Sequence, residues 1–101
     1  MDKLNKDELA QLSKALGHPH RLEIINILVN LSSNSQCMVG NIVDKLPISQ
    51  STVSQHLKIL KEAGWIKGNI EGSRVCYCLK EDIFEKYTAM LNKLKEKSKK
   101  Q

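Results

Sequence analysis

The sequence predicts a mostly α-helical domain that carries one two-stranded β-hairpin. Three observations predict this fold class. Apolar residues recur at helical spacing over most of the chain, the spacing changes to two between Trp65 and Leu79, and helical spacing returns after Lys80. Because the chain has 101 residues and no long linker, we expect one domain over residues 1–101.

Two helices are predicted near the N-terminus. The segment KDELAQLSKALG carries leucines at helical spacing and then stops at a glycine. The segment HPHRLEIINILVNL restarts at once, and Pro19 suits its first turn. The predicted buried stripe of this second helix consists of Leu22, Ile25, Leu28 and Val29.

A short helix and a longer helix are predicted next, after the polar loop SSNSQ. The short helix covers CMVGNIVDKL and ends at Pro47, and the longer helix begins at the N-cap Ser49 and stops at Gly64. The inward-facing residues of the short helix are expected to be Val39, Ile42, Val43 and Leu46. Those of the longer helix, at i, i+4 and i+7, are Val53, Leu57 and Leu60.

A hairpin and a last helix complete the predicted order. The hairpin turns at NIEGSR, where glycine favours a tight turn. The last helix covers residues 81–97, and its Lys-rich end, residues 93–101, is expected to fray. Its apolar stripe consists of Phe84, Tyr87, Met90, Leu91 and Leu94. A short helix, a tight break and a longer helix followed by a two-stranded wing form a winged helix-turn-helix.

The bulk charge indicates a polyanionic partner. The net charge is +5 and the sequence pI is about 9.2, which favours nucleic acid first and an anionic membrane surface second. The basic residues are scattered, so no membrane partner is expected. No apolar run is long enough to span a bilayer and the N-terminus has no signal-peptide pattern, so we expect a cytoplasmic protein. Its three cysteines are then expected to be thiols or metal ligands rather than structural disulfides.

The polar face of the longer helix is unusual for a surface that merely meets water. Ser51, Ser54, Gln55 and Lys58 share one face, flanked by Gln50 and Thr52. Serine and threonine are poor helix-interior residues, but small hydroxyl and amide groups can contact base edges in a DNA major groove. The predicted DNA-contacting residues are Gln50, Ser51, Thr52, Ser54, Gln55, His56, Lys58 and Arg74.

Two members of this set have open alternatives. His56 lies next to the buried stripe, so it either completes the edge of the core or contacts a phosphate. Arg74 lies at the wing tip, where an arginine either enters a minor groove or pairs with phosphate, or remains a solvated loop charge.

Three segments, KALGHPHRLEIINIL, ISQSTVSQHLKILKEAGWIKG and EGSRVCYCL, resemble the ArsR/SmtB family of bacterial and archaeal repressors. The resemblance implies a homodimer formed through the first and last helices. It also implies binding to an imperfect palindrome in double-stranded operator DNA, and release by a metal, metalloid or oxidant. The residues expected at the dimer interface are Leu9, Leu12, Phe84, Tyr87, Leu91 and Leu94.

The sensing sites that the resemblance implies are missing at several positions. Met38 and Gly40 occupy the places where many metal-sensing members carry two cysteines, and the last helix has Asp82 but no histidine. His18 and His20 match no ligand set of the family, so we interpret them as a structural pair in a loop.

The three cysteines remain as candidate sensors. Cys76 and Cys78 share one side of a strand, and Cys37 is expected to lie near them. Opposite the pair, and expected to be core, are Val75, Tyr77 and Leu79, so the two thiols should lie on the more exposed side. Such thiolates would suit As(III), cadmium (Cd) or zinc (Zn), or would react with oxidants or persulfides. A disulfide between Cys76 and Cys78 is disfavoured by their spacing.

Other functions remain open beside cysteine-based sensing. The chain could be a regulator with no small-molecule sensor, Cys37 being a buried apolar residue and the other two cysteines incidental. A thiol redox protein is a further alternative. An enzyme is not expected, because the sequence has no evident catalytic triad, phosphate-binding loop or carboxylate pair.

Overall fold

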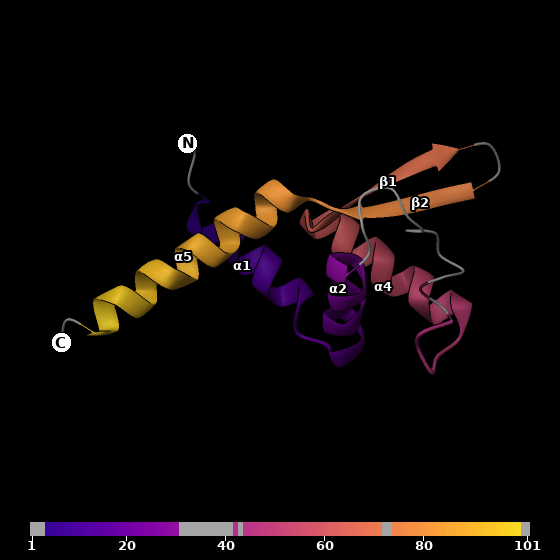
Figure 1. Cartoon of the computed structure of the whole chain (residues 1–101), viewed down its shortest axis with the longest axis horizontal. Coiled ribbons are helices and arrows are strands. Elements are labelled where there is room, and N and C mark those ends of the chain that lie inside the picture. Colours follow the sequence, from indigo (N-terminus) through magenta and orange to yellow (C-terminus); the bar gives the residue numbers. More distant parts are fainter. Residues whose placement is uncertain (1–3, 31–41, 43, 72–73, 100–101) are drawn as a thin grey trace.

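The computed structural model describes residues 4–30, 42, 44–71 and 74–99. Along the chain lie α1 (Lys6–Ala15), α2 (Pro19–Asn30), α4 (Gln50–Ala63), β1 (Ile66–Glu71), β2 (Arg74–Leu79) and α5 (Glu81–Lys99) (Figure 1). This order confirms the mostly helical fold with a hairpin wing. The predicted short helix over residues 37–46 falls mostly outside the described residues, although Ile42 and Leu46 are buried as expected.

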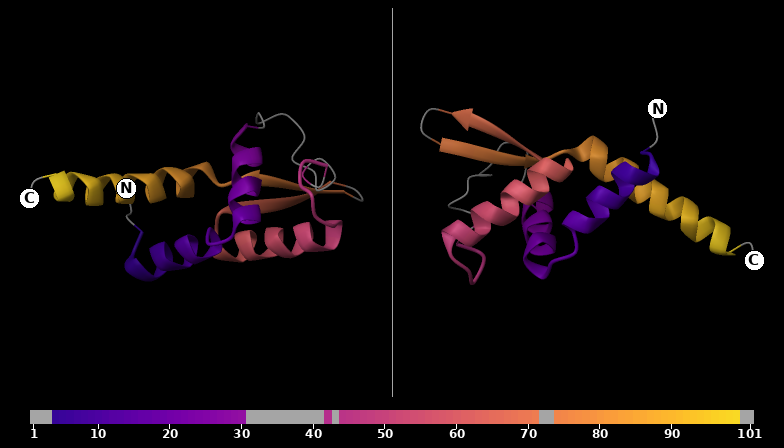
Figure 2. Two further views of the ribbon diagram at one scale, coloured as in Figure 1. Left: turned by 90° about the horizontal axis from the view of Figure 1, so that it is seen from below. Right: turned by 180° about the vertical axis from the view of Figure 1, so that it is seen from behind.

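The helix α4 is the centre of the body, since it packs against α1, α2 and β1. The hairpin and α5 leave this body in opposite directions (Figures 1 and 2), which gives the molecule extents of 51 × 28 × 23 Å. α5 stays helical through most of residues 93–101, where we expected a frayed tail; the fraying itself stays a prediction.

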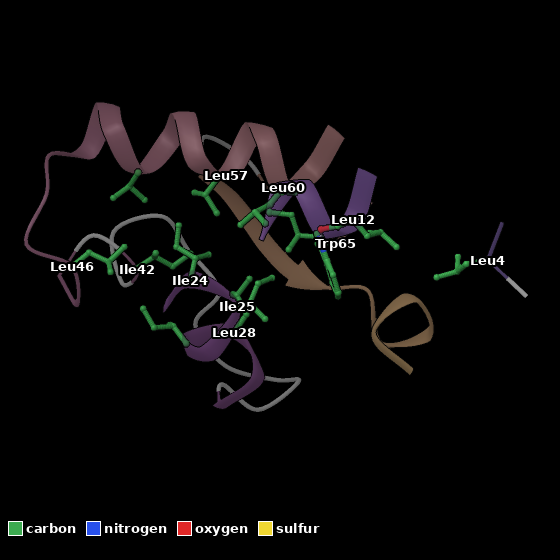
Figure 3. Packing of buried hydrophobic residues seen from close by; sticks show 14 residues of the cluster. Leu4, Leu12, Ile24, Ile25, Leu28, Ile42, Leu46, Leu57, Leu60 and Trp65 are labelled. Carbon is green, nitrogen blue, oxygen red and sulfur yellow. Dashed lines mark hydrogen bonds between the residues drawn. The ribbon is translucent and has the colours of Figure 1, made fainter. Parts of the chain in front are cut away.

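The buried side of α4 is the one that the sequence predicts. Val53, Leu57 and Leu60 are fully buried. Figure 3 shows Leu57 and Leu60 pointing from α4 toward α2, where Ile24 and Ile25 lie. These contacts between apolar side chains set the orientation of α4, and its opposite face is left to solvent.

The predicted stripe of α2 is wrong at two positions. Leu22 and Val29 are 52% and 49% exposed, whereas Ile24 and Ile27 are buried with Ile25 and Leu28. Apolar residues at 22, 24, 25, 27, 28 and 29 form two overlapping stripes, so spacing alone did not decide which one is covered. α2 contacts both α4 and β2, and the position of these two elements selects the stripe that contains Ile24 and Ile27.

Both predicted ends of α4 are confirmed. The side chain of Ser49 caps the N-terminus by accepting a hydrogen bond from the backbone N–H of Thr52, at 3.3 Å. At the C-terminus, Gly64 adopts φ +105°, a left-handed conformation that strains any residue with a Cβ. The chain can therefore turn directly from α4 into the wing.

The wing is an antiparallel hairpin in which Ile66 faces Leu79 at the base and Glu71 faces Arg74 at the tip. Gly68 lies opposite Tyr77, and a Cβ at this glycine would come within 3.2 Å of the tyrosine ring. The lack of a side chain at residue 68 thus leaves room for the ring of Tyr77 beside β1.

Over the described ranges, no helix is long and apolar enough to cross a membrane.

Candidate nucleic-acid interface

The outward face of α4 carries most of the predicted DNA-contacting residues. All of its members are exposed: Gln50, Ser51, Thr52, Ser54, Gln55 and Lys58. Apart from the flanking Gln50 and Thr52, they lie on the side of α4 away from the buried leucines, so the packing of the core holds this face toward solvent. Over its first two turns the face carries only hydroxyl and amide side chains, with no charged or aromatic residue, which allows a close approach by another molecule.

The first turn of α4 is organised around the hydroxyl of its cap. The Oγ of Ser49 lies 3.1 Å from Oγ of Ser51 and 2.9 Å from Oγ1 of Thr52. A hydroxyl has one donor and two acceptor sites, so Ser51 and Thr52 keep hydrogen-bonding capacity beyond this network. No acidic residue lies in the first turn, and the positive end of the helix dipole is therefore not neutralised by a carboxylate. This end of α4 is suited to a phosphate group.

His56 does not lie on this face. The residue is only 7% exposed and belongs to the buried side of α4, as the alternative placement at the edge of the core requires. Its Nδ1 lies 3.2 Å from Nη1 of Arg21, which lies in the first turn of α2. Burial lowers the pKa of His56 below its ordinary value of 6.5, and the positive charges of His18, Arg21 and His20 lower it further. The side chain of Arg74 lies outside the described residues.

A cluster of three imidazoles was missed by the sequence analysis, which interpreted His18 and His20 as a structural pair in a loop. Each of His18, His20 and His56 offers a ring nitrogen, and these nitrogens all lie within 4.8 Å of one another. The rings of His18 and His56 are the nearest pair, with centroids 4.5 Å apart. The signal in the sequence was two histidines around a proline at a helix start. Nothing in the sequence showed that the middle of α4 passes beside that start.

The wing cysteines are placed differently from the prediction. Cys76 and Cys78 are half-buried and pack against the core, as do Tyr77 and Leu79, whereas Val75 is 38% exposed. The expectation that the two thiols occupy the more exposed side is therefore wrong. β2 also contacts α2, a neighbour that the sequence did not place beside the strand. The sulfur of Cys76 takes part in a disulfide, so the expectation that all three cysteines are thiols or metal ligands is wrong for Cys76. Cys37 lies outside the described residues.

The residues expected at a dimer interface divide into two groups. Leu12 is 2% exposed and belongs to the core of the protomer, so it is not available to a second chain. Leu9, Phe84 and Tyr87 are partly buried against the same core.

The outer part of α5 forms the second group. Leu91 and Leu94 are 46% and 57% exposed, so this projecting helix presents apolar side chains to solvent within the isolated chain.

Comparison with known proteins agrees with this geometry. The family model described as "Bacterial regulatory protein, arsR family" matches residues 18–67. An uncharacterized HTH-type transcriptional regulator of Methanocaldococcus jannaschii is 35% identical over 88 residues, which cover 87% of this chain and 96% of that protein. The HTH-type transcriptional repressor SmtB of Mycobacterium tuberculosis is 41% identical over 73 residues, or 72% of this chain and 51% of SmtB. The matched part of this chain thus spans about half the length of SmtB.

Solved structures show the same fold. A homodimeric winged helix-turn-helix DNA-binding domain from Mycobacterium bovis superposes with a TM-score of 0.69 at 23% identity, covering 100% of this chain and 96% of that one. Reduced HlyU from Vibrio cholerae superposes with a TM-score of 0.63 at 32% identity, covering 74% of this chain and 75% of that one.

Proposed function

Because the chain belongs to the ArsR family of helix-turn-helix transcriptional repressors, we propose that it acts in the cytoplasm as a homodimer that binds operator DNA through α4. The observation that carries this proposal is the exposed face of small polar side chains on α4, held outward by the buried Val53, Leu57 and Leu60. The net charge of +5 supplies attraction to the phosphate backbone. The family comprises regulators of transcription rather than enzymes.

Each polar residue of α4 has a role in the proposed complex. Gln50, Ser54 and Gln55 contact base edges in the major groove, where glutamine pairs with adenine and serine can form a hydrogen bond with several different bases. Ser51 and Thr52, at the positive end of the helix, bind a phosphate or a thymine methyl group. Lys58 contacts the phosphate backbone of the DNA. At the wing tip, Arg74 reaches a minor groove or a phosphate.

The proposed dimer pairs α5 of one chain with α5 of its partner through the exposed Leu91 and Leu94. Phe84 and Tyr87 fix the inner end of α5 to the body, because their rings lie 6.3 Å and 4.9 Å from the ring of Trp65. A two-fold axis through α5 presents two α4 helices to successive major grooves, about one helical turn apart. The operator is then an imperfect palindrome. The homodimeric domain from Mycobacterium bovis is consistent with such pairing.

The proposed signal is read by the cysteines. Cys76 already takes part in a disulfide, and the related HlyU has been solved in a reduced form, so oxidation or persulfidation is the favoured signal. Cys37, the cysteine outside the described residues, is the proposed partner of Cys76. As(III), Cd or Zn bound by Cys37, Cys76 and Cys78 is the second candidate signal. Either event joins the wing to the segment before α4 and changes the angle at which the two α4 helices meet DNA.

DNA binding is tested by fluorescence anisotropy with a labelled duplex taken from upstream of the gene, against a shuffled duplex of the same composition. We expect two chains per duplex, a preference for the upstream sequence, and an affinity that falls linearly on a log–log plot against salt concentration. Equal affinity for the two duplexes would show that the chain does not read sequence.

Sensing is tested on the preformed DNA complex. A persulfide donor, a mild oxidant, arsenite, Cd²⁺ and Zn²⁺ are added separately to the wild type, Cys76→Ser and the matched variant Cys78→Ser. Release by oxidant that is lost in Cys76→Ser and retained in Cys78→Ser supports disulfide sensing. Release by an ion, with thiolate-to-metal absorption in the ultraviolet, supports a metal site. Release that is the same in all three proteins would remove these cysteines from the mechanism and leave a regulator without a cysteine sensor.

A further inference from the structure

The cluster of His18, His20 and His56 lies away from the wing cysteines and has no part in the proposed function. His18 directly precedes α2, His20 lies in the first turn of α2, and His56 comes from the middle of α4. Their ring nitrogens converge within 4.8 Å, and these three are the only histidines of the chain. We infer that the cluster is a binding site for a borderline divalent transition-metal ion, such as Zn²⁺, Ni²⁺ or Cu²⁺, and that Arg21 competes with the ion for His56.

The geometry of the three nitrogens fits such an ion after a small movement. Zn–N bonds of about 2.0–2.1 Å place the ligand nitrogens of a tetrahedral site roughly 3.3 Å apart. The widest pair of nitrogens therefore has to approach by at most about 1.5 Å from the 4.8 Å limit. His18 and His20 are only half-buried, and Nδ1 of His18 accepts a hydrogen bond from the backbone N–H of His20 at 3.0 Å, so an ion bound to this nitrogen of His18 displaces this bond as well. A fourth position remains for water, and imidazole ligands suit zinc, nickel and copper.

The hydrogen bonds of the cluster determine what the ion must displace. An arginine can only donate, so Nδ1 of His56 accepts the hydrogen bond from Arg21, and the ring proton of the neutral imidazole is on Nε2. An ion that binds Nδ1 takes the lone pair that faces Arg21. An ion that binds Nε2 requires the ring proton on Nδ1, where it meets the N–H of Arg21. In both cases the ion and the contact between Arg21 and His56 exclude each other.

Arg21 also joins the helices around the cluster. Its Nε donates to the carbonyl oxygen of Ala15 at 2.6 Å and its Nη1 lies 3.2 Å from Nδ1 of His56, so one guanidinium at the start of α2 connects the end of α1 with α4. Binding of an ion breaks the contact between Arg21 and His56 and joins His56 to His18 and His20 instead. If α4 binds DNA as proposed above, this exchange alters how α4 is held against α1 and α2. The ion site itself does not depend on that proposal.

Ion binding is measured directly, in the 101-residue chain with Cys37, Cys76 and Cys78 replaced by serine so that no thiolate competes. Isothermal titration with Zn²⁺ and optical titration with Co²⁺ should give one ion per chain. The Co²⁺ spectrum should show ligand-field bands without sulfur-to-cobalt charge transfer. His20→Gln and His56→Gln should each weaken binding by at least about tenfold. Because His56 is buried, circular dichroism confirms folding, and the half-buried His20 provides the decisive variant.

The competition is tested with a matched pair of variants. Arg21→Met removes the donor and the charge and should tighten Co²⁺ binding by about threefold or more. Lys14→Met removes a neighbouring cation from the depression that Lys14 and Arg21 both line, and should have a smaller effect. Co²⁺ binding that is unchanged in His20→Gln, or weaker in Arg21→Met, would overturn the inference. A protein that binds Co²⁺ as expected but no DNA would refute only the proposed function.

Discussion

The indole Nε1 of Trp65 donates a hydrogen bond to the backbone oxygen of Leu12 at 2.8 Å, and both residues are buried. In a regular helix this oxygen would accept from the N–H of Leu16, but that N–H bonds to Ser13 instead. Trp65 therefore satisfies a carbonyl group near the end of α1. The base of the wing and the first helix are fixed to each other by one side chain that the sequence analysis placed only in a strand.

Trp65→Phe should destabilise the protein by about 1–3 kcal/mol, because the buried oxygen of Leu12 loses its partner and the core loses part of the indole. Tyr87→Phe is the comparison. It removes the exposed 2.8 Å contact between the Tyr87 hydroxyl and Oγ of Ser13, and should cost less than about 1 kcal/mol. Urea unfolding measures both. An equal decrease in the free energy of unfolding in the two variants would contradict the assignment of Trp65 as the link between α1 and the wing.

Leu91→Asp should convert the proposed dimer to a monomer, because a carboxylate would have to be buried between two copies of α5. Leu22→Asp is the matched control, since Leu22 is a similarly exposed leucine on α2, at 52% against 46%. Sedimentation velocity reports the mass of each variant. If Leu91→Asp remains a dimer, or if Leu22→Asp alone dissociates, the proposed α5 interface is wrong.

Acid should destabilise the folded chain through His56. Burial and the facing charges of His18, Arg21 and His20 hold its pKa below 6.5 in the folded protein, while the unfolded chain keeps the ordinary value. The unfolded chain therefore binds more protons below about pH 6.5. The contribution of His56 is complete above that pH and is lost as the pH falls toward the folded-state pKa.

The test compares urea unfolding of the wild type and His56→Gln between pH 7.5 and 5.5, with a chelator present. Titration of the carboxylates contributes similarly to both proteins, so the difference isolates His56. The variant should show the shallower decline. Parallel curves would mean that His56 does not titrate differently in the two states.

The sequence predicted those elements whose limits are set by local chemistry. Ser49 and Gly64 mark the ends of α4 because a cap and a left-handed turn need particular side chains. The stripe of Val53, Leu57 and Leu60 was clear because only one other apolar residue, Ile59, lies between Val53 and Leu60.

The sequence did not predict the features that depend on contacts between segments distant in the chain. Two apolar stripes were possible on α2, and the contacts of this helix with its neighbours bury the one that contains Ile24 and Ile27. His56 joined His18 and His20 only because α4 crosses the start of α2, a relationship between residues 36 to 38 positions apart in the chain. Leu12 looked available to a partner chain because nothing local showed that it belongs to the buried core, as Trp65 does.

The central claim is that the exposed face of α4 reads base sequence, and the most direct measurement is the ratio of affinities for upstream and shuffled DNA in single variants. Gln50→Ala and Ser54→Ala should lower this ratio, each by a factor corresponding to about 1–3 kcal/mol. Lys58→Ala should weaken binding to both duplexes alike, and the control Gln11→Ala, an exposed glutamine on α1, should change neither. A ratio that is unchanged in both Gln50→Ala and Ser54→Ala would contradict the account.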